Sequence, residues 1–254
     1  TVNCNSLYLR SEMYTVQLKS WTHSTSVSSN DINCPLPLKN GDNLFSEING
    51  KPASLLTFLN GKSTVSVTDE QAYQLGLILG KMHNISTDLK INRKNPMSLG
   101  SFPKLIDISS NTAENFSKNL NKVISEEYNR ILSNWPEKLP SGIIHADLFP
   151  DNVLFNDNKI SGVIDFSFSC NDFLSYDLSI CINAWCFRDG EFDISLSNNL
   201  LNGYQKIREL NKEELKQLPI LCSGSALRFL LTRLADWKVS NGDAMVTPKN
   251  PDEF

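Results

Sequence analysis

One run of residues near the middle of the chain restricts its fold more than any other feature. Residues 142–155 read Gly-Ile-Ile-His-Ala-Asp-Leu-Phe-Pro-Asp-Asn-Val-Leu-Phe. Ile143–His145 predict a short buried strand that leads into a tight loop. Val153–Phe155, a polar turn and Ile160–Asp165 predict a β-hairpin. The order of strand, loop and hairpin brings the polar residues of the loop close to the end of the hairpin.

The spacing of these polar residues indicates phosphoryl transfer. Asp147 can orient a hydroxyl and accept its proton, and Asn152 and Asp165 can hold Mg2+ beside the phosphates of ATP. A neutral amide oxygen suits Mg2+ where phosphate already supplies negative charge. We expect His145 to anchor the loop through hydrogen bonds rather than to transfer protons. The sequence therefore predicts a kinase-like catalytic centre that uses ATP and Mg2+.

Other interpretations of the same residues exist. A lone His-x-Asp is common, Asp147 or Asp151 could simply cap a turn, and Asp165 could close a strand. A metal-dependent hydrolase could use His145 and Asp147 as ligands, but no third obvious His or carboxylate cluster stands at ligand spacing. The complete order of strand, loop, hairpin and final Asp favours the kinase interpretation.

The composition is that of a globular protein without an electrostatic footprint for nucleic acid. The chain has 254 residues, 40% of them hydrophobic, and a net charge of -4 with no dense cluster of Lys and Arg. Its 6 cysteines are sparse and form no Cys-x-x-Cys pair, which fits a reducing cytoplasm. The longest apolar run, Leu218–Leu227, stops at Arg228, short of the roughly 18 residues that a membrane helix needs. We expect a cytoplasmic protein that does not enter a membrane.

Two composition regimes predict two lobes. Residues 1–60 are rich in Ser, Thr and Asn, with stretches such as Tyr14–Lys19 and Pro52–Leu59 that indicate strands. The remainder, residues 61–254, is mostly helical in pattern. The prediction is an α+β, bilobal fold with a small β-rich nucleotide-binding lobe, a hinge near residues 58–62 and a large helical lobe for catalysis and substrate. A cleft between the lobes would be a natural ligand site.

Three helical regions are predicted in the large lobe. A capping box, Thr68-Asp69-Glu70-Gln71, begins a helix that ends near His83 and Asn84. Asn111–Trp135 has the pattern of one long polar helix, closed by Pro136. Residues 173–239 predict further helices.

The motifs are similar to those of a known group. Residues 145–153, His-Ala-Asp-Leu-Phe-Pro-Asp-Asn-Val, resemble the catalytic loop of the aminoglycoside phosphotransferase and choline kinase superfamily, which has a protein-kinase-like fold. Within that superfamily, further segments resemble the homoserine kinase family: residues 34–37, 56–61, 172–178, 182–187 and 226–237. The resemblance covers residues 34–254.

The resemblance implies ATP-dependent phosphorylation of the side-chain hydroxyl of L-homoserine, giving O-phospho-L-homoserine for threonine biosynthesis. It also implies that the backbone of Thr57, Phe58 and Leu59 contacts adenine. The small-molecule substrate is a zwitterion, so its pocket needs a cation for the carboxylate and an acceptor for the ammonium.

Four residues are candidates for the contacts with homoserine. Arg228 or Arg233 could supply the cation, because an Arg in an apolar helix is unfavourable unless it is paired. Asp172 or Asp236 could supply the acceptor. Alternatively, Arg233 and Asp236 merely pair with each other on one helix face.

The first 33 residues depart from the pattern of a kinase small lobe. No Gly occurs before Gly41, so a Gly-rich phosphate loop is missing. Lys19 is the only basic candidate for ATP binding on its strand. Gln17 could face the phosphates instead, or Lys19 could simply be a solvated residue at the edge of the sheet. Ser20–Asn33 contains no Glu and is too short for the expected helix. The small lobe is therefore predicted to be incomplete.

Two further functions stay open. One is a related small-molecule kinase acting on choline, methylthioribose or an aminoglycoside. The other is a non-catalytic nucleotide-binding protein, suggested by the short small lobe. An aminoglycoside would favour an acidic pocket, whereas the late helices mix Arg with Asp, which suits a zwitterion better. The sequence does not indicate an oligomeric state.

Overall fold

The computed structural model describes residues 32–39, 41–43, 46–49, 51–87, 92–237 and 249–251. The strand predicted at Tyr14–Lys19, with the ATP-binding candidate Lys19, lies outside these residues. The chain divides into two compact units, the first made of residues 1–94 and 141–210 and the second of residues 95–140 and 211–254. These units are not the lobes of residues 1–60 and 61–254, which stay a prediction.

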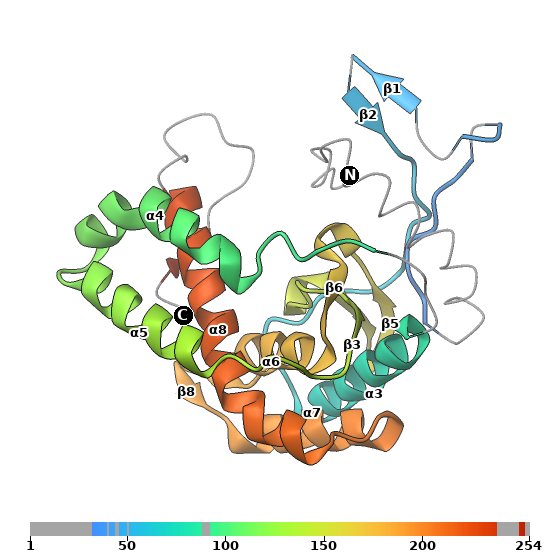
Figure 1. Cartoon of the computed structure of the whole chain (residues 1–254). Helices are drawn as coiled ribbons and strands as arrows, with labels where there is room; N and C mark the ends of the chain where they lie inside the picture. Colours follow the sequence, from blue (N-terminus) through green and yellow to red (C-terminus); the bar gives the residue numbers. More distant parts are fainter. Residues whose placement is uncertain are drawn as a thin grey trace. The chain divides into compact units, whose positions relative to one another are not determined.

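In its described residues, the first unit combines short strands with helices (Figure 1). Its strands are β1 (Ser46–Ile48), β2 (Lys51–Ala53), β3 (Ser141–Ile144), β4 (Val153–Asn156), β5 (Lys159–Val163), β6 (Cys170–Phe173), β7 (Phe187–Arg188) and β8 (Glu191–Phe192). Its helices are α3 (Asp69–Ser86), α6 (Leu174–Trp185) and α7 (Ile194–Ile207), with 3-10 turns η2 (Pro150–Asn152) and η3 (Phe166–Phe168). The described strands pair as two-stranded antiparallel ladders, β1–β2, β3–β6, β4–β5 and β7–β8.

The hairpin predicted after the central loop is confirmed as β4–β5. Val153 pairs with Val163, and Asn156 pairs with Lys159 across the polar turn. β5 ends two residues before Asp165, which itself adopts a left-handed backbone with φ of 60°. On the other side of the loop, β3 pairs with β6, so the strand before the loop and the strand after Asp165 are hydrogen-bonded neighbours.

α3 begins at the predicted capping box. The Gln71 N–H donates to Oγ1 of Thr68 at 3.2 Å, and the Thr68 N–H donates to Oε1 of Gln71 at 3.1 Å. These two bonds satisfy main-chain donors that would otherwise lack partners at a helix start. The predicted helix over this region is confirmed, and it continues to Ser86.

Glycines allow α3 and α7 to pack backbone against backbone. A Cβ added to Gly76 of α3 would lie 2.1 Å from the Leu200 carbonyl oxygen, and one added to Gly203 of α7 would lie 2.1 Å from the carbonyl oxygen of Tyr73. No side chain larger than hydrogen fits at either position. Because the two helices approach this closely, side chains at the same interface, such as those of His83 and Tyr204, can reach each other directly.

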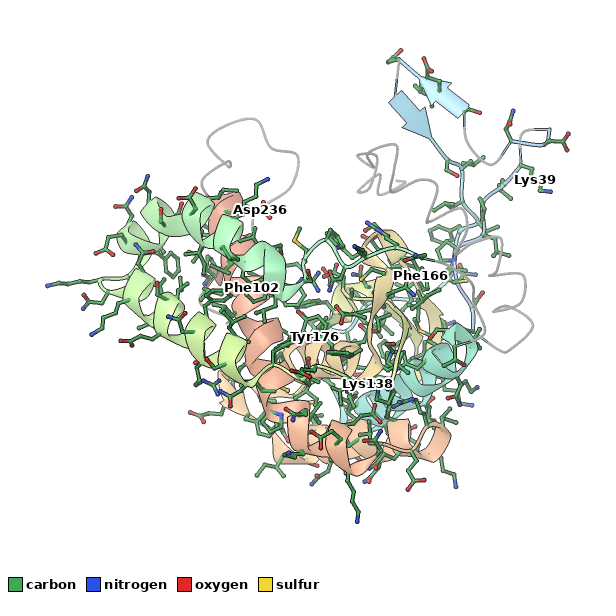
Figure 2. All side chains as sticks on the ribbon, in the orientation of Figure 1. Lys39, Phe102, Lys138, Phe166, Tyr176 and Asp236 are labelled. Atoms are coloured by element: carbon green, nitrogen blue, oxygen red, sulfur yellow. The ribbon has the colours of Figure 1, made fainter. Side chains whose placement is uncertain are left out.

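The second unit is a helical bundle with an apolar centre. It contains η1 (Leu99–Ser101), α4 (Phe102–Phe116), α5 (Leu120–Asn134) and α8 (Lys212–Trp237). Phe102, labelled in Figure 2, is buried in the cluster that these helices form. The other buried members are Ala113, Ile124, Ile131, Ile220, Leu227, Leu231 and Leu234. Apolar burial of this kind is the main stabilising contribution in a bundle.

α8 is long and apolar enough to span a membrane when judged by length and composition alone, although the sequence led us to expect no such segment. In the structure, 61% of its apolar stretch is buried inside the protein. Such burial is typical of a helix at the centre of a bundle, and the helix packs against α4 and α5.

Three predictions about secondary structure were wrong. Asn111–Trp135 is not one helix, because the chain leaves α4 at Ser117 and passes through a left-handed Asn119, with φ of 68°, before α5 begins. The strand expected at Pro52–Leu59 ends at Ala53 and continues as an isolated bridge between Leu56 and Pro37. Prolines in the facing segment provide no N–H, so the ladder cannot extend.

The third correction concerns residues 173–239, which are not all helical. The short β7–β8 hairpin separates α6 from α7. It turns at Asp189 and Gly190, both with positive φ of 51° and 81°. An Asp-Gly pair is a strong signal for this kind of hairpin turn, and here it outweighs the helical pattern of the flanking residues.

Candidate active site

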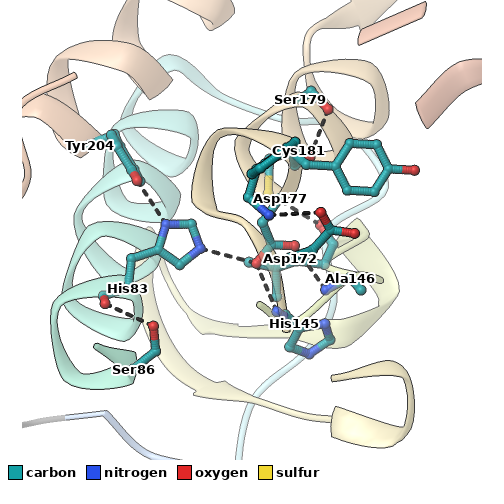
Figure 3. A network of polar contacts seen from close by, with 12 residues as sticks. His83, Ser86, His145, Ala146, Asp172, Asp177, Ser179, Cys181 and Tyr204 are labelled. Carbon is teal, nitrogen blue, oxygen red and sulfur yellow. Dashed lines mark hydrogen bonds and ion pairs between the residues drawn. The ribbon is translucent and has the colours of Figure 1, made fainter. Parts of the chain in front are cut away.

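A buried carboxylate holds the central loop in place. The main-chain N–H groups of His145 and Ala146 donate to Oδ2 and Oδ1 of Asp177, each at 2.8 Å (Figure 3). Ala146 has a left-handed backbone, with φ of 66°, which an L-residue with a Cβ adopts only when its surroundings enforce it. The bidentate grip of Asp177 supplies this enforcement and turns the chain so that Asp147 follows directly on a fixed main chain.

Asp177 in turn lies at the end of a chain of buried polar side chains. His83 Nε2 is 3.2 Å from Oδ2 of Asp177, and His83 Nδ1 is 2.7 Å from the hydroxyl of Tyr204. A proton on Nε2 satisfies the bond to Asp177 and leaves Nδ1 to accept from Tyr204. Arg208 donates to the same hydroxyl at 3.0 Å. Side chains of α3, α6 and α7 therefore jointly fix the loop.

The environment of Asp177 keeps its carboxyl ionised. Burial alone would raise the pKa of Asp177, but hydrogen bonds from His83 and from the His145 main chain outweigh it, and the pKa lies below its ordinary value. A buried carboxylate that accepts three N–H groups is a strong anchor, because each bond is charge-assisted and shielded from water.

His145 anchors the loop at a second point. Its Nε2 lies 3.1 Å from the carbonyl oxygen of Ile164, and its Nδ1 accepts from the Asp147 N–H at 3.3 Å. The ring also packs against Phe166, with centroids 4.9 Å apart (Phe166 is labelled in Figure 2). Burial lowers the pKa of His145 despite the opposing charge of Asp177, so the ring is neutral with its proton on Nε2. These contacts support an anchoring role rather than proton transfer.

The structure brings Asp147, Asn152 and Asp165 together. Asn152 Nδ2 donates to the main-chain oxygen of Asp147 at 2.8 Å and to its Oδ2 at 3.3 Å. The Ile164 N–H donates to the main-chain oxygen of Asn152 at 2.9 Å, which ties the loop to the residue that precedes Asp165. Oδ1 of Asp165 accepts from the N–H of Ser167 at 3.2 Å and from its hydroxyl at 2.5 Å.

Two oxygens of this group are available as metal ligands. Within the described part of the chain, Oδ1 of Asn152 and Oδ2 of Asp165 accept no hydrogen bond. Oxygen donors are the ligands that Mg2+ prefers, and it usually combines one or two protein ligands with phosphates and waters. The described residues hold no group of three or more His, Cys, Asp or Glu that could bind a metal by itself. The two oxygens therefore suit an ion that arrives with a phosphate ligand.

The predicted adenine-binding segment runs beside the β4–β5 hairpin. Thr57 is committed to Leu36, since its N–H donates to the Leu36 oxygen and its hydroxyl accepts from the Leu36 N–H, both at 2.9 Å. The main-chain groups of Phe58 and Leu59 bond to no residue that the structure describes. Nearby, the Lys62 N–H donates to the oxygen of Phe155 in β4 at 2.9 Å. Of the three candidates, Phe58 and Leu59 keep their main chain available.

The four candidate substrate residues are divided between the units. Asp172 belongs to the first unit, on β6, where its Oδ1 accepts from the Phe173 N–H at 2.8 Å. Arg228, Arg233 and Asp236 belong to the second unit, on α8. Their assembly into one pocket stays a prediction.

The α8 candidates differ in their surroundings. Arg228 is buried, with its guanidinium 4.6 Å from the ring centroid of Phe229. Arg233 donates to the main-chain oxygen of Asn250 at 2.7 Å. The alternative in which Arg233 and Asp236 pair with each other stays a prediction. Burial raises the pKa of Asp236, as expected for a half-buried carboxyl group.

Asp177, His83 and Tyr204 were not among the functional residues predicted from the sequence. One signal was available for Asp177, which stands in the otherwise uncharged helix segment Leu174–Trp185. A charged residue in such a segment is unfavourable unless it is paired, and the same argument singled out the α8 arginines. His83 lies 94 residues before Asp177 and 121 residues before Tyr204, so no local pattern in the sequence indicates that they are partners.

Comparison with known proteins identifies the class to which this fold and site belong. Residues 24–210 match the phosphotransferase enzyme family. The fold is also that of solved kinases. An amicoumacin kinase, hAmiN, shares it with a TM-score of 0.68 at 17% identity, over 96% of this chain and 75% of that one. A choline kinase from Cryptosporidium parvum Iowa II shares it with a TM-score of 0.61 at 14% identity, over 90% and 73% of the two chains.

Two curated relatives narrow the class. The homoserine kinase of Agrobacterium fabrum is 43% identical over 230 residues, which is 90% of this chain and 71% of the relative. The homoserine kinase of Rhizobium rhizogenes is 44% identical over 230 residues, 90% and 72% of the two chains. The chain therefore belongs to the phosphotransferase enzyme family, in the group of the homoserine kinases. The predicted α+β kinase-like fold and the predicted family are confirmed.

Proposed function

We propose that the protein transfers the γ-phosphoryl group of ATP to the side-chain hydroxyl of L-homoserine. One observation carries the chemistry: Asn152 bonds to Asp147 by its side chain and to the residue before Asp165 by its main chain. Hydrogen bonds thereby tie the loop that carries the candidate base Asp147 and the candidate metal ligand Asn152 to the main chain next to the second candidate ligand, Asp165, as phosphoryl transfer requires. The identity to homoserine kinases over 90% of the chain supports the choice of acceptor.

The residues of the loop have separate roles in this proposal. Asp147 orients the hydroxyl of homoserine and accepts its proton as the new oxygen–phosphorus bond forms and the bond to the leaving ADP breaks. Asn152 and Asp165 hold Mg2+, which when bound neutralises the charge of the phosphates. His145 and Asp177 keep the loop in the geometry that Asp147 needs, and neither exchanges a proton with substrate.

The same proposal assigns further residues to the contacts with ATP and homoserine. The main chain of Phe58 and Leu59 contacts the adenine of ATP. Asp172 or Asp236 accepts from the ammonium of homoserine, and Arg228 or Arg233 pairs with its carboxylate. We place the reaction in the cytoplasm, where the product feeds threonine biosynthesis. The described cysteines are free thiols, which suits a reducing compartment: Cys34, Cys170, Cys181, Cys186 and Cys222.

The experiment that tests the proposal is ADP release by the purified chain with Mg-ATP. L-Homoserine is compared with choline, methylthioribose and kanamycin as acceptors. We expect turnover with homoserine alone and a loss of about 1,000-fold in Asp147→Asn, within the range of about 100- to 10,000-fold for removal of a general base. Asp157→Asn is the matched control, because Asp157 lies exposed in the hairpin turn.

The possible results separate the alternatives. Turnover with another acceptor would replace homoserine by that substrate and leave the kinase chemistry intact. ATP binding without turnover on any of the four acceptors would favour a non-catalytic nucleotide-binding protein. Full activity in Asp147→Asn would contradict the role of Asp147.

A further inference from the structure

Arg93 contacts the segment that follows Asp165, although no sequence motif drew attention to it. Its main chain is fixed first. The Arg93 N–H donates to Oδ1 of Asn171, and the Asn171 N–H donates back to the Arg93 oxygen, both at 2.7 Å. Lys94 adds a parallel bridge to the same residue. Residue 93 is therefore attached to the edge of β6, and its side chain starts from a fixed point.

The guanidinium of Arg93 then reaches back along the chain. Nη1 donates to the main-chain oxygen of Ser167 at 2.8 Å and to that of Ser169 at 2.9 Å. The two carbonyls lie at the end of η3, the single turn that separates Asp165 from β6. One positive group thus holds both carbonyls in one orientation. Bonds of this kind are charge-assisted and stronger than bonds between neutral groups.

The contact with Ser167 links Arg93 to the candidate metal ligand. Ser167 is the residue whose N–H and hydroxyl both bond to Oδ1 of Asp165. Arg93 fixes the main chain of Ser167, Ser167 fixes one oxygen of Asp165, and the other oxygen is left to face a metal. Asp165 also has a left-handed backbone, which requires support from outside the residue.

We propose that Arg93 is a positioning residue that orients the Asp165 carboxylate for Mg2+. The proposal rests on the proposed function, because that function assigns Asp165 to the metal. Arg93 acts through Ser167 and touches neither Asp165 nor substrate in this role. Residues that orient a metal ligand in this indirect way typically change metal affinity by about 10- to 100-fold when they are replaced.

The test measures metal binding directly. Mn2+ is titrated into the protein with ADP present, and free Mn2+ is followed by electron paramagnetic resonance. We expect Arg93→Ala to weaken Mn2+ binding about tenfold. Arg93→Lys should weaken it less, because it keeps the charge but lacks the planar fork of donors. Arg130→Ala is the matched control, since the exposed Arg130 of α5 also donates two hydrogen bonds from one guanidinium nitrogen, to the side chains of Glu127 and of Ser223 on α8.

Steady-state kinetics separate positioning from a direct role. The Mg2+ concentration for half-maximal rate should rise about tenfold in Arg93→Ala, while KM for homoserine changes less than about twofold. A raised KM for homoserine with unchanged Mn2+ affinity would overturn the proposal and make Arg93 a substrate contact. Unchanged Mn2+ affinity in both Arg93 variants would also overturn it. If Arg93→Ala does not fold, Arg93→Lys alone decides between these results.

The proposal can fail independently of the proposed function. If the parent chain phosphorylates none of the acceptors, the Mn2+ titration still reports whether Arg93 affects the metal site. If the parent chain phosphorylates homoserine but Arg93→Ala binds Mn2+ as tightly as the parent, the function stands and the role of Arg93 is wrong.

Discussion

Two loops carry the proposed catalytic groups, and opposite chemistry holds them. The loop around Asp147 is held by a carboxylate, Asp177, which accepts two main-chain N–H groups. The loop after Asp165 is held by a guanidinium, Arg93, which donates to two main-chain carbonyls. Asp177 is fully buried, whereas Arg93 is only partly buried. Water can replace a lost hydrogen-bond partner at the second loop but not at the first. Loss of Asp177 should therefore destabilise the protein more than loss of Arg93.

The difference in burial suits the roles that we propose. Asp147 must face the hydroxyl in one geometry, and a rigid anchor favours this. Asp165 must receive an ion that arrives with a nucleotide, and an anchor near water can adjust as the ion binds. Behind the first loop stands the closely packed pair α3 and α7, which supplies His83 and Tyr204. Among the described residues, the main chain of Arg93 is held by Asn171 of β6, without a closely packed helix pair behind it.

The largest effect is expected from breaking the buried anchor. Asp177→Asn keeps the volume but replaces an acceptor oxygen by an NH2 group, which then faces a main-chain N–H or His83. We expect a loss of about 4 kcal/mol in the free energy of unfolding, measured with urea at pH 7. Asp157→Asn in the exposed turn should change it by less than about 0.5 kcal/mol. A loss below about 1 kcal/mol in Asp177→Asn would mean that water enters this site.

A second change separates the helix pair from the anchor itself. Gly203→Ala puts a methyl group against the Tyr73 carbonyl, so α7 must move away from α3. We expect a loss of about 2 to 3 kcal/mol in the free energy of unfolding, with the bond between His83 and Tyr204 lengthened. Gly100→Ala is the control, because a Cβ there meets nothing closer than 4.0 Å. Equal stability of the two variants would show that the helix pair is loosely packed.

The sequence predicted the elements that are determined by residues close together along the chain. The β4–β5 hairpin was predictable because its strands are joined by a short polar turn, and α3 was predictable from the capping box at Thr68. The break near Asn119 was not, because Ser117, Lys118 and Asn119 are polar residues that can also stand on an exposed helix face. Asp147, Asn152 and Asp165 are grouped by short-range spacing, so the sequence could identify them as one site. Their anchors come from distant segments and become visible only when the helices pack.

The pH dependence of stability distinguishes two buried groups beside the first loop. Burial lowers the pKa of His145 below its ordinary 6.5, so from that pH downward the unfolded chain binds a proton that the folded chain does not. Stability should therefore fall on acidification, by at most about 1.4 kcal/mol per pH unit for one proton. The pKa of Asp177 is lowered too, so its contribution is lost only below pH 3.8, as the pH falls toward the folded value.

The measurement is the free energy of unfolding by urea at several values between pH 5 and 7. His145→Gln can keep the bond to the Ile164 oxygen but does not titrate, so its profile should be flatter than that of the parent chain. The difference between the two profiles isolates His145 from the other histidines. Parallel profiles would mean that His145 titrates normally in the folded protein.

The smallest effect is expected from removing the N-terminal cap of α3, the helix whose His83 supports the first loop. Thr68 caps α3 some four turns before His83, and its bonds with Gln71 lie near solvent. Thr68→Ala should lower the free energy of unfolding by about 1 kcal/mol, the usual contribution of an N-cap. Thr87→Ala, which removes a hydroxyl bond at the other end of α3, should lower it by less than about 0.5 kcal/mol. ADP release should be unchanged in both variants, because the close packing at Gly76 and Gly203 lies between the cap and His83 and keeps α3 in place. A loss of activity in Thr68→Ala that exceeds its loss of stability would mean that the first loop depends on the whole length of α3, and not on its packing with α7.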